Sequence, residues 1–375
     1  MRGPGPWQDA SFSRNPLPSD RSARAVGGGG NFPAGLRPLQ WREISDRERT
    51  APGNRGRIDE SMSEGVSGRA PSIERVMCAI DFSETADLAL RHATEIARRT
   101  QARLVLGHVI EPLPVVSYPI LMVPPDGELE LRRLATDRLE ARAAALREAG
   151  LVVETRLEQG PPGPMLVELS TEIGADLCVV GTRGLSGFEH LLFGSTAEYV
   201  VRHSASPVLT VHPGDEPLDR PMENVIVPTD LGPDSGEAID LVVMLFAGRE
   251  HPRVTLLFAD RPVPYLEPFQ HEILEEWHAP DTRKGEVESK LAPLADRLRA
   301  AGFEVESEIR DGPPVKVIVD LAEERGADLI VMNTRGRSTL AELFLGRTTK
   351  RIVQHAPCPV LTRRSAAPEK RSTHE

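Results

Sequence analysis

Short apolar runs alternate with longer amphipathic segments along most of this chain, beginning at Ile73. The runs are typical of buried strands, whereas the longer segments repeat apolar residues every three or four positions, as helices do when one face packs on a sheet. Strands are predicted at 74–81, 103–110, 151–157, 176–180 and 207–211, and helices at 86–97, 128–148, 163–173 and from Ser195 onward. Because parallel strands need crossovers of this length, the pattern predicts an α/β fold: a doubly wound, mostly parallel, five-stranded sheet in the order 3-2-1-4-5, flanked by helices.

The same pattern then occurs a second time. Glu223–Asp230 restates Glu74–Asp81, and the residues from Gly160 to Thr210 recur at a constant offset of 152 positions. Such self-similarity indicates a tandem duplication, so we predict two domains, a first copy at 71–214 and a second copy at 220–364. Pro228 falls in a strand of the second copy, and because proline cannot donate to a ladder we expect it at the strand's exit.

The first 70 residues do not share this pattern. They contain 11 glycines and 7 prolines and no sustained apolar period. So little apolar surface cannot offset the entropy of ordering, and residues 1–70 are predicted to be a disordered extension, with 365–375 as a flexible tail. Met62 opens more ordinary sequence and is a second candidate, beside Met1, for the start of translation.

Charge and cysteine usage narrow the class of protein. The formal net charge is -11, which argues against nucleic acid or an anionic membrane as a partner. Cys78, Cys178 and Cys358 are far apart and show no C-x-x-C spacing, so buried reduced thiols in the cytoplasm are expected. No apolar run approaches the roughly 18 residues that a membrane span needs, and the N-terminus lacks the apolar core of a signal peptide.

Candidate chemistry gathers where the fourth strand ends. Gly181 and Gly184 follow that strand, and Gly194 and Ser195 stand where the next helix begins. Glycines let the backbone turn tightly and approach a ligand, while a serine hydroxyl and the first helix amides can bind an anion. An ordinary glycine-rich loop is the alternative. In the predicted sheet the winding reverses between the first and fourth strands, so Asp81 and Gly181 are expected in one crevice.

These residues resemble those of a known family. The spacing Gly181-x2-Gly184-x9-Gly194-Ser195, with Asp81 ending the first strand, is similar to the ATP-binding type of universal stress protein. The resemblance covers about 290 residues as two fused domains. It implies an ATP-binding, nucleotide-gated regulatory protein of the stress response, with slow or no hydrolysis and an unknown protein partner.

The resemblance also implies a role for each site residue. Asp81 would accept a hydrogen bond from the nucleoside, and Val109 would contact adenine. Mg²⁺ or Mn²⁺ would be carried by the ATP, since no carboxylate cluster suggests a metal site of its own. No catalytic residue is predicted. The phosphates would be held by Gly181, Thr182, Arg183, Gly184, Gly194, Ser195 and Thr196.

Assembly is implied as well. Isolated domains of this family commonly pair through their last strands, which here are Val208–Val211 and Val360–Thr362. Both are short apolar strands that would otherwise be exposed edges. Within one chain they can pair with each other, and a further homodimer of chains is compatible with the sequence.

Several alternatives stay open at this point. Asp81 is also a good residue to cap the following helix, and Arg183 is as well suited to solvent as to phosphate. His108 is expected to be a strand-edge histidine rather than a catalyst, and His203 and His355 to be structural. The apolar segment 113–124 is either a lid over adenine or a flap facing a partner.

Two other functions compete with a nucleotide-gated regulator. The first is an ATP-dependent enzyme of the same architecture, either an ATPase or an adenylating ligase. Neither a G-x-x-x-x-G-K-[ST] loop nor a paired acid with a positioned base supports it. The second is a purely structural pair of domains that binds no nucleotide.

The second copy departs from the motif at two positions. Asn333 replaces the first glycine and Arg347 replaces the serine, while Gly336, Gly346 and Asp230 remain. Asparagine tolerates a left-handed backbone, so the first change alone need not abolish the turn. Arg347 would either neutralise phosphate charge or fill the cradle. We predict that the second copy is a degenerate site that supports the first.

Overall fold

The structure is a computed structural model that describes residues 72–112, 127–184, 193–217, 220–247, 251–260, 280–334 and 345–364. All of them belong to one compact unit, Val66–Glu375. The predicted N-terminal extension, the apolar segment 113–124, Gly336 and the tail 365–375 lie outside the described residues.

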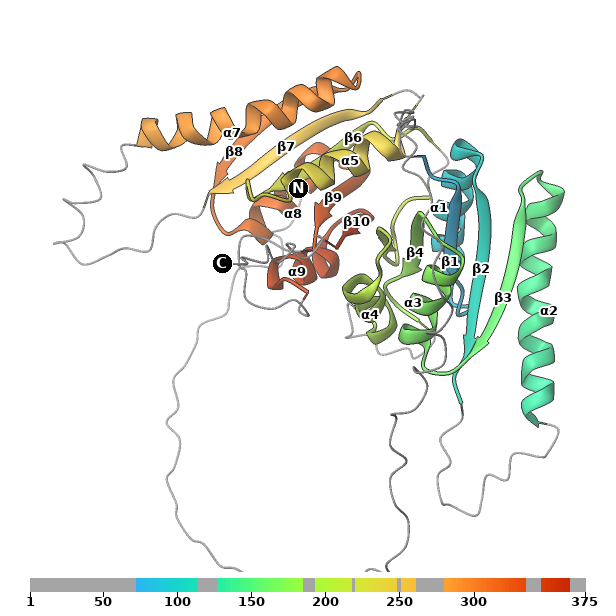
Figure 1. Cartoon of the computed structure of the whole chain (residues 1–375). Coiled ribbons are helices and arrows are strands. Elements are labelled where there is room, and N and C mark those ends of the chain that lie inside the picture. The colour runs from blue at the N-terminus through green and yellow to red at the C-terminus, as the bar shows by residue number, and fades with distance from the viewer. Residues whose placement is uncertain are drawn as a thin grey trace, which may run out of the picture. The chain divides into compact units, whose positions relative to one another are not determined.

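The first copy alternates strands and helices as the sequence pattern predicts (Figure 1). Its strands are β1 Arg75–Ala79, β2 Arg103–Ile110, β3 Val153–Gln159, β4 Leu177–Gly181 and β5 Val208–Val211. Its helices are α1 Glu84–Thr100, α2 Gly127–Glu148, α3 Pro162–Glu172 and α4 Ser195–His203.

The second copy repeats this order. Its strands are β6 Asn224–Thr229, β7 Arg253–Asp260, β8 Glu304–Asp311, β9 Leu329–Asn333 and β10 Val360–Arg363. Its helices are α5 Ser235–Leu245, α7 Pro280–Ala300, α8 Pro314–Arg325 and α9 Arg347–His355.

One sheet contains the ten strands, in the order β3-β2-β1-β4-β5-β10-β9-β6-β7-β8. Within each copy the strands are parallel and follow the predicted order 3-2-1-4-5, which confirms the fold class. The two halves join where β5 pairs with β10, the antiparallel junction among the described strands. This junction is the pairing of last strands expected from the sequence.

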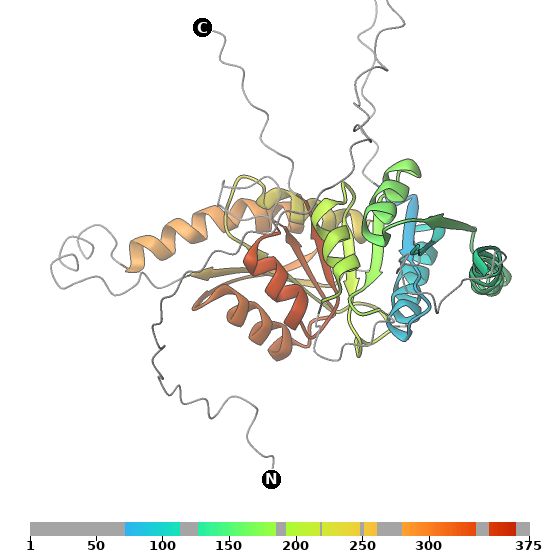
Figure 2. The same cartoon turned by 90° about the horizontal axis from the view of Figure 1, so that it is seen from below.

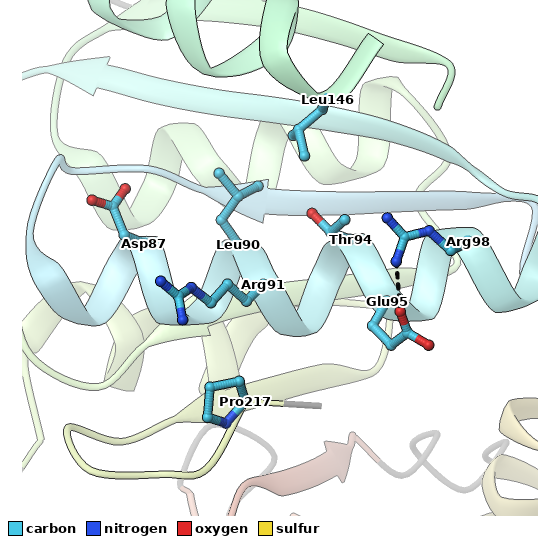
Figure 3. Close-up of a pocket in the computed structure, with 8 residues that line it drawn as sticks. All are labelled: Asp87, Leu90, Arg91, Thr94, Glu95, Arg98, Leu146 and Pro217. Carbon is cyan, nitrogen blue, oxygen red and sulfur yellow. Dashed lines mark hydrogen bonds and ion pairs between the residues drawn. The ribbon is translucent and has the colours of Figure 1, made fainter. Parts of the chain in front are cut away.

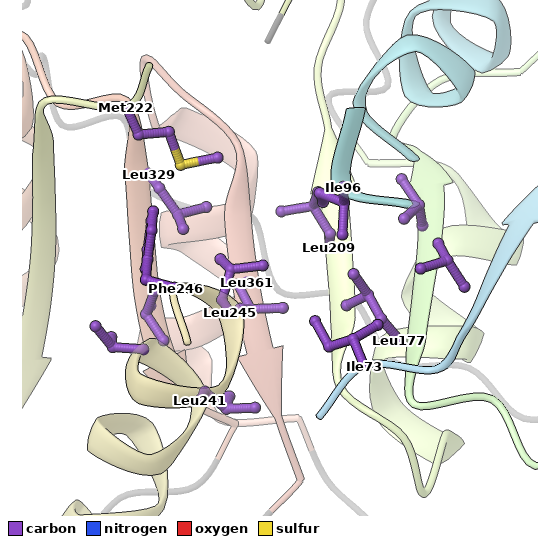
Figure 4. Packing of buried hydrophobic residues seen from close by; sticks show 14 of the residues in the cluster. Ile73, Ile96, Leu177, Leu209, Met222, Leu241, Leu245, Phe246, Leu329 and Leu361 are labelled. Atoms are coloured by element: carbon purple, nitrogen blue, oxygen red, sulfur yellow. The ribbon is translucent and has the colours of Figure 1, made fainter. Parts of the chain in front are cut away.

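Helices cover both faces of this sheet (Figures 1 and 2). The buried side chains alternate between the two layers. Val76 and Cys78 of β1 point toward α1, α2 and their counterparts, whereas Met77 between them packs with α3, α4 and theirs. Figure 4 shows the first layer at the junction, where Leu209 and Leu361 lie among buried side chains from both copies. Each layer is therefore one apolar core shared by the two copies.

Strand β3 begins two residues later than predicted. Gly150 has a left-handed backbone (φ +88°) and its amide donates to the carbonyl of Arg147, while the Leu151 amide donates to the carbonyl of Leu146. These bonds complete the C-terminal cap of α2, which leaves Leu151 unable to start the strand. The apolar run Leu151–Val153 is thus divided between a helix cap and a strand.

Pro228 lies at the end of its strand, as expected. It is the second-last residue of β6 and lies opposite Leu257 of β7. The ladder of β6 with β9 is limited to Val225 and Ile226, so Pro228 comes after that pairing has ended. Its missing N–H therefore costs the central strand no bond on the β9 side.

His92 is a buried histidine on the inward face of α1. Its side chain is 0% exposed, and Leu241 occupies the equivalent position of α5 in the second copy. Burial lowers the pKa of His92 to about 4, although the carboxylate of Asp215 acts in the opposite direction. The folded protein therefore holds this ring neutral well below the pH at which a free histidine is protonated.

We predict that His92 makes the protein acid-sensitive. The unfolded chain takes up a proton at this residue near pH 6.5, while the folded chain does so near pH 4, so stability falls as the pH drops through that window. His92→Leu should remove about 2 to 3 kcal/mol of the stability loss between pH 7 and 4.5 in denaturant unfolding. Changing exposed His355 to Gln should leave the pH dependence unaltered. Identical pH profiles for wild type and His92→Leu would contradict this account.

Candidate functional site

The candidate site lies where β1, β2 and β4 end. Ala79 pairs with Gly107, so Asp81 and Val109, each two residues further on, lie at the same height along the strand direction. Cys78 pairs with Val179 of β4, so Thr182 lies at the same height as Asp81, each being three residues further on. Three predicted site residues thus come from three adjacent strands at the carboxyl edge of the sheet, where ligands bind in open α/β folds.

Asp81 and Gly184 lie against each other. The Asp81 Oδ1 atom accepts hydrogen bonds from the Ser83 amide (3.0 Å) and the Ser83 hydroxyl (2.6 Å). A Cβ placed on Gly184 would stand only 2.5 Å from the other oxygen, Oδ2. A side chain at position 184 would therefore displace the carboxylate, which explains the glycine.

Ser83, not Asp81, caps helix α1. Its hydroxyl accepts a hydrogen bond from the Ala86 amide at 3.1 Å, and its backbone is extended. The interpretation of Asp81 as the cap is wrong, since Phe82 intervenes with a left-handed backbone (φ +66°) that separates the carboxylate from the helix. Sequence reasoning missed the role of Ser83 because two good capping residues stand close together. The useful signal was that Ser83 is the one immediately before the helix.

The motif glycines serve close packing rather than an unusual backbone. Gly181, Gly184 and Gly194 do not adopt positive φ, so the absence of a Cβ matters here for close approach and not for a left-handed backbone. A Cβ on Gly181 would lie 3.0 Å from Cγ2 and 3.2 Å from the backbone carbon of Thr85. The glycine therefore lets the first turn of α1 pack directly on the end of β4.

The phosphate half of the predicted site is built around the start of α4. The Gly194 amide donates to the carbonyl of Thr182 at 2.8 Å and closes the loop between them. Gly194 is the N-cap and has no side chain to offer, so the first amides of α4 lack an intrahelical partner. Ser195 is exposed there and Thr196 is half-buried. This arrangement suits an anion.

Two buried polar atoms next to this loop have no hydrogen-bond partner within the described ranges. They are the hydroxyl oxygen of Thr182 and the Nε of Arg183. No ion pair involves the Arg183 guanidinium among the residues that the structure describes. Both side chains therefore retain capacity for polar contacts at the strand end.

His108 stabilises the end of β1. Its Nδ1 lies 2.6 Å from the carbonyl oxygen of Ile80, and its ring is 4.5 Å from that of Phe82. Burial lowers the pKa of His108, although the bond to Ile80 and the carboxylate of Asp81 oppose the shift. The neutral ring carries its proton on Nδ1 and holds the strand end, which agrees with the expectation of a strand-edge histidine.

The structure also shows the surroundings of His203, His355 and the three cysteines. His203 stacks on Tyr199 at 4.0 Å and bonds to its carbonyl, whereas His355 is exposed at the end of α9. The three cysteines, Cys78, Cys178 and Cys358, are buried and unpaired, and burial raises the pKa of each thiol. In the described part of the chain, no helix is both long and apolar enough to cross a membrane.

The second copy keeps the backbone hydrogen bonds of the site but carries a different residue at the end of β9. Asp230 Oδ1 accepts from the Gly232 amide at 2.9 Å, and the Gly346 amide closes its loop onto the carbonyl of Thr334. Asn333 has no positive φ, so its tolerance of a left-handed backbone is irrelevant. Its Nδ2 instead donates to the carbonyl of Asp234 at 2.6 Å. In the second copy a side chain thus bonds to the N-cap residue of α5, whereas in the first copy α1 packs directly on Gly181.

Arg347 stands at the first position of α9, where Ser195 stands on α4. Its side chain is exposed, and no described residue forms an ion pair with it. The second copy therefore replaces a hydroxyl with a cation at the start of this helix. Gly336, the remaining glycine of the motif, is not among the described residues.

A surface groove lies apart from these residues, along α1 (Figure 3). Its volume is about 480 Å³, and Asp87 at one end is held by Arg142. None of the predicted site residues contributes to it. The groove is lined by Asp87, Leu90, Arg91, Thr94, Glu95, Arg98, Leu146 and Pro217.

Comparisons with known proteins agree with this architecture. The sequence profile of the Universal stress protein family matches residues 72–212 and again 222–364. A universal stress protein of Staphylococcus saprophyticus is 33% identical over 148 residues, which are 38% of this chain and 86% of the relative. The solved structure of a universal stress protein from Archaeoglobus fulgidus superimposes with a TM-score of 0.57 at 20% identity, covering 79% of this chain and 97% of that one. One from Pseudomonas aeruginosa gives 0.52 at 18% identity, covering 79% and 94%, so both share the fold.

We predict that Gly181 is required for packing. Gly181→Ala should lower the free energy of unfolding by about 1 to 3 kcal/mol, because the new Cβ presses on the backbone of Thr85. Gly285→Ala is the matched control: beyond its own helix backbone and chain neighbours, no described atom lies within 4 Å of its Cβ position in α7, so the change should stabilise by about 0.5 to 1 kcal/mol. Denaturant unfolding measures both. A Gly181→Ala protein as stable as wild type would show that α1 does not need this space.

Proposed function

Because this chain belongs to the universal stress protein family, we propose that its first copy binds ATP and that the protein is a nucleotide-gated regulator of the stress response. One observation carries the proposal. The Asp81 carboxylate rests against Gly184, and the Gly194 amide at the open N-terminus of α4 donates to the carbonyl of Thr182. An acceptor for a sugar lies beside Gly184, and a donor set for phosphates lies at Gly194, whose amide is bonded to Thr182.

Asp81 suits the nucleoside end. Its Oδ1 is occupied by Ser83, which fixes the carboxylate and leaves Oδ2 turned toward Gly184. A carboxylate oxygen is an acceptor for ribose hydroxyls, and hydrogen bonds to charged groups are among the stronger ones. Val109, half-buried on the neighbouring strand, offers an apolar contact for the adenine base.

The start of α4 suits the phosphates. The helix dipole and the open amides favour an anion, and the hydroxyls of Ser195 and Thr196 add donors. The Arg183 guanidinium, which pairs with no carboxylate in the described ranges, supplies a charge that can bind phosphate oxygens. Mg²⁺ or Mn²⁺ would arrive with the nucleotide, because the described residues contain no cluster of three metal-ligating side chains.

The second copy would then be a supporting domain without a nucleotide of its own. Asn333 replaces the first glycine of the motif, and its side-chain amide is bonded to the Asp234 carbonyl. Arg347 lacks the hydroxyl that Ser195 offers at the helix start. We therefore expect one ATP per chain, bound by the first copy.

A regulatory role is favoured over an ATP-dependent enzyme. His108, whose ring lies near Asp81, donates its Nδ1 proton to the Ile80 carbonyl and so holds the end of β1. Binding without rapid turnover is the behaviour expected of a protein whose nucleotide changes its choice of partner. The buried, unpaired thiols fit a reducing compartment, so we place this function in the cytoplasm.

We predict that full-length protein binds Mg-ATP once per chain in titration calorimetry. Asp81→Asn should raise the Kd about tenfold or more, since it weakens a charged acceptor. Arg183→Gln should act in the same direction. Asp230→Asn is the matched control from the second copy and should change the Kd less than twofold.

Three results would contradict the proposal. Two equivalent ATP sites per chain would show that the second copy binds, and equal losses from Asp81→Asn and Asp230→Asn would remove the role of the first. Turnover near roughly 10 per second would instead indicate an enzyme. Circular dichroism of each variant separates a lost contact from a lost fold.

A further inference from the structure

The junction between the two copies is symmetric in sequence. Leu209 of β5 lies opposite Leu361 of β10, and the two are counterparts at the duplication offset of 152. The Thr210 hydroxyl donates to the Val360 carbonyl at 3.0 Å, and the Thr362 hydroxyl donates to the Val208 carbonyl at 3.2 Å. Each bond is the counterpart of the other. The interface is therefore isologous: residues near its axis face their own equivalents.

One pair beside this axis breaks the equivalence. Glu198 of α4 and Lys350 of α9 are also counterparts at the offset of 152, and they bind each other. The Lys350 ammonium lies 2.8 and 2.9 Å from the two carboxylate oxygens of Glu198. At 22% and 39% exposure the two side chains are partly shielded from water, which strengthens the attraction. Two identical copies would place like charges here.

The charges around this pair differ between the copies. Glu198 also accepts from Arg202 of its own helix at 3.1 Å, whereas the counterpart of Arg202 is Gln354. Helix α9, Arg347–His355, carries cations and no carboxylate. A pair of first copies would face carboxylate to carboxylate with only their own arginines to offset it. A pair of second copies would face ammonium to ammonium with nothing to offset it.

The strands themselves cannot tell these pairings apart. The first three residues are the same in the two strands, Val208–Val211 and Val360–Arg363. Main-chain hydrogen bonds between strands do not depend on which side chains the strands carry. Discrimination between first–second, first–first and second–second pairing must therefore come from side chains beside the strands. Opposite charges in one arrangement and like charges in the others provide it.

We propose that Glu198 and Lys350 select the pairing of a first copy with a second copy. The last-strand surface of the first copy fits a domain that presents a cation at the Glu198 position, and it rejects one that presents a carboxylate. The chain consequently closes on its own second half instead of pairing like copy with like copy of another chain.

A charge-reversal cycle on the full-length protein tests this. Hydrogen–deuterium exchange of the β5 and β10 amides reports opening of the junction. Glu198→Lys and Lys350→Glu should each speed that exchange about threefold to tenfold, and the double reversal should return it to within about twofold of wild type. Added salt should reduce the difference between the single variants and wild type.

The matched control is Asp320→Lys, which reverses one partner of the exposed Lys316–Asp320 pair on α8. It should leave exchange at β5 and β10 unchanged. Two results would overturn the proposal: single reversals that leave the junction amides unaffected, or a double reversal that fails to restore them.

Discussion

Pairing of β5 with β10 is the interaction on which the rest of this structure depends. It turns two five-stranded sheets into one and covers two apolar strands that would otherwise be exposed edges. Both core layers run through it, so Leu209 and Leu361 are buried by side chains of both copies. Neither copy could expose this surface to water without losing part of its core.

The candidate site depends on a second constraint, the shared level of three strand ends. Register between β1, β2 and β4 fixes where Asp81, Val109 and Thr182 emerge. Glycines then remove side chains where α1 and the loop come closest to the strands. The geometry that would receive a ligand thus follows from packing, and in the second copy Asn333 makes a hydrogen bond to Asp234 at the strand end where the first copy has Gly181 against α1.

Much of this architecture follows from the sequence because periodicity and duplication are strong signals. Alternating elements gave the sheet order, and topology alone placed Asp81 beside the glycine loop. Asp81 and Ser83 were both reasonable caps, and the choice of Ser83 required the exact start of α1 and the backbone angle of Phe82. The start of β3 was misplaced because Leu151 is apolar in either role, and only the bonds of the α2 cap decide it.

Joining the central strands leaves β3 and β8 as the outer strands of the sheet. Both are rich in charge: Glu154, Arg156 and Glu158 on one, and four acidic residues with Arg310 on the other. Arg156 pairs with Glu172 and Arg310 with Glu324, so these edges carry hydrated ion pairs. A strand from another chain that added to β3 or β8 would have to remove water from these ion pairs. In the duplicated protein the apolar edge strands β5 and β10 pair with each other, and the charged strands β3 and β8 form the outer edges of the sheet. This arrangement disfavours edge-to-edge aggregation into fibres.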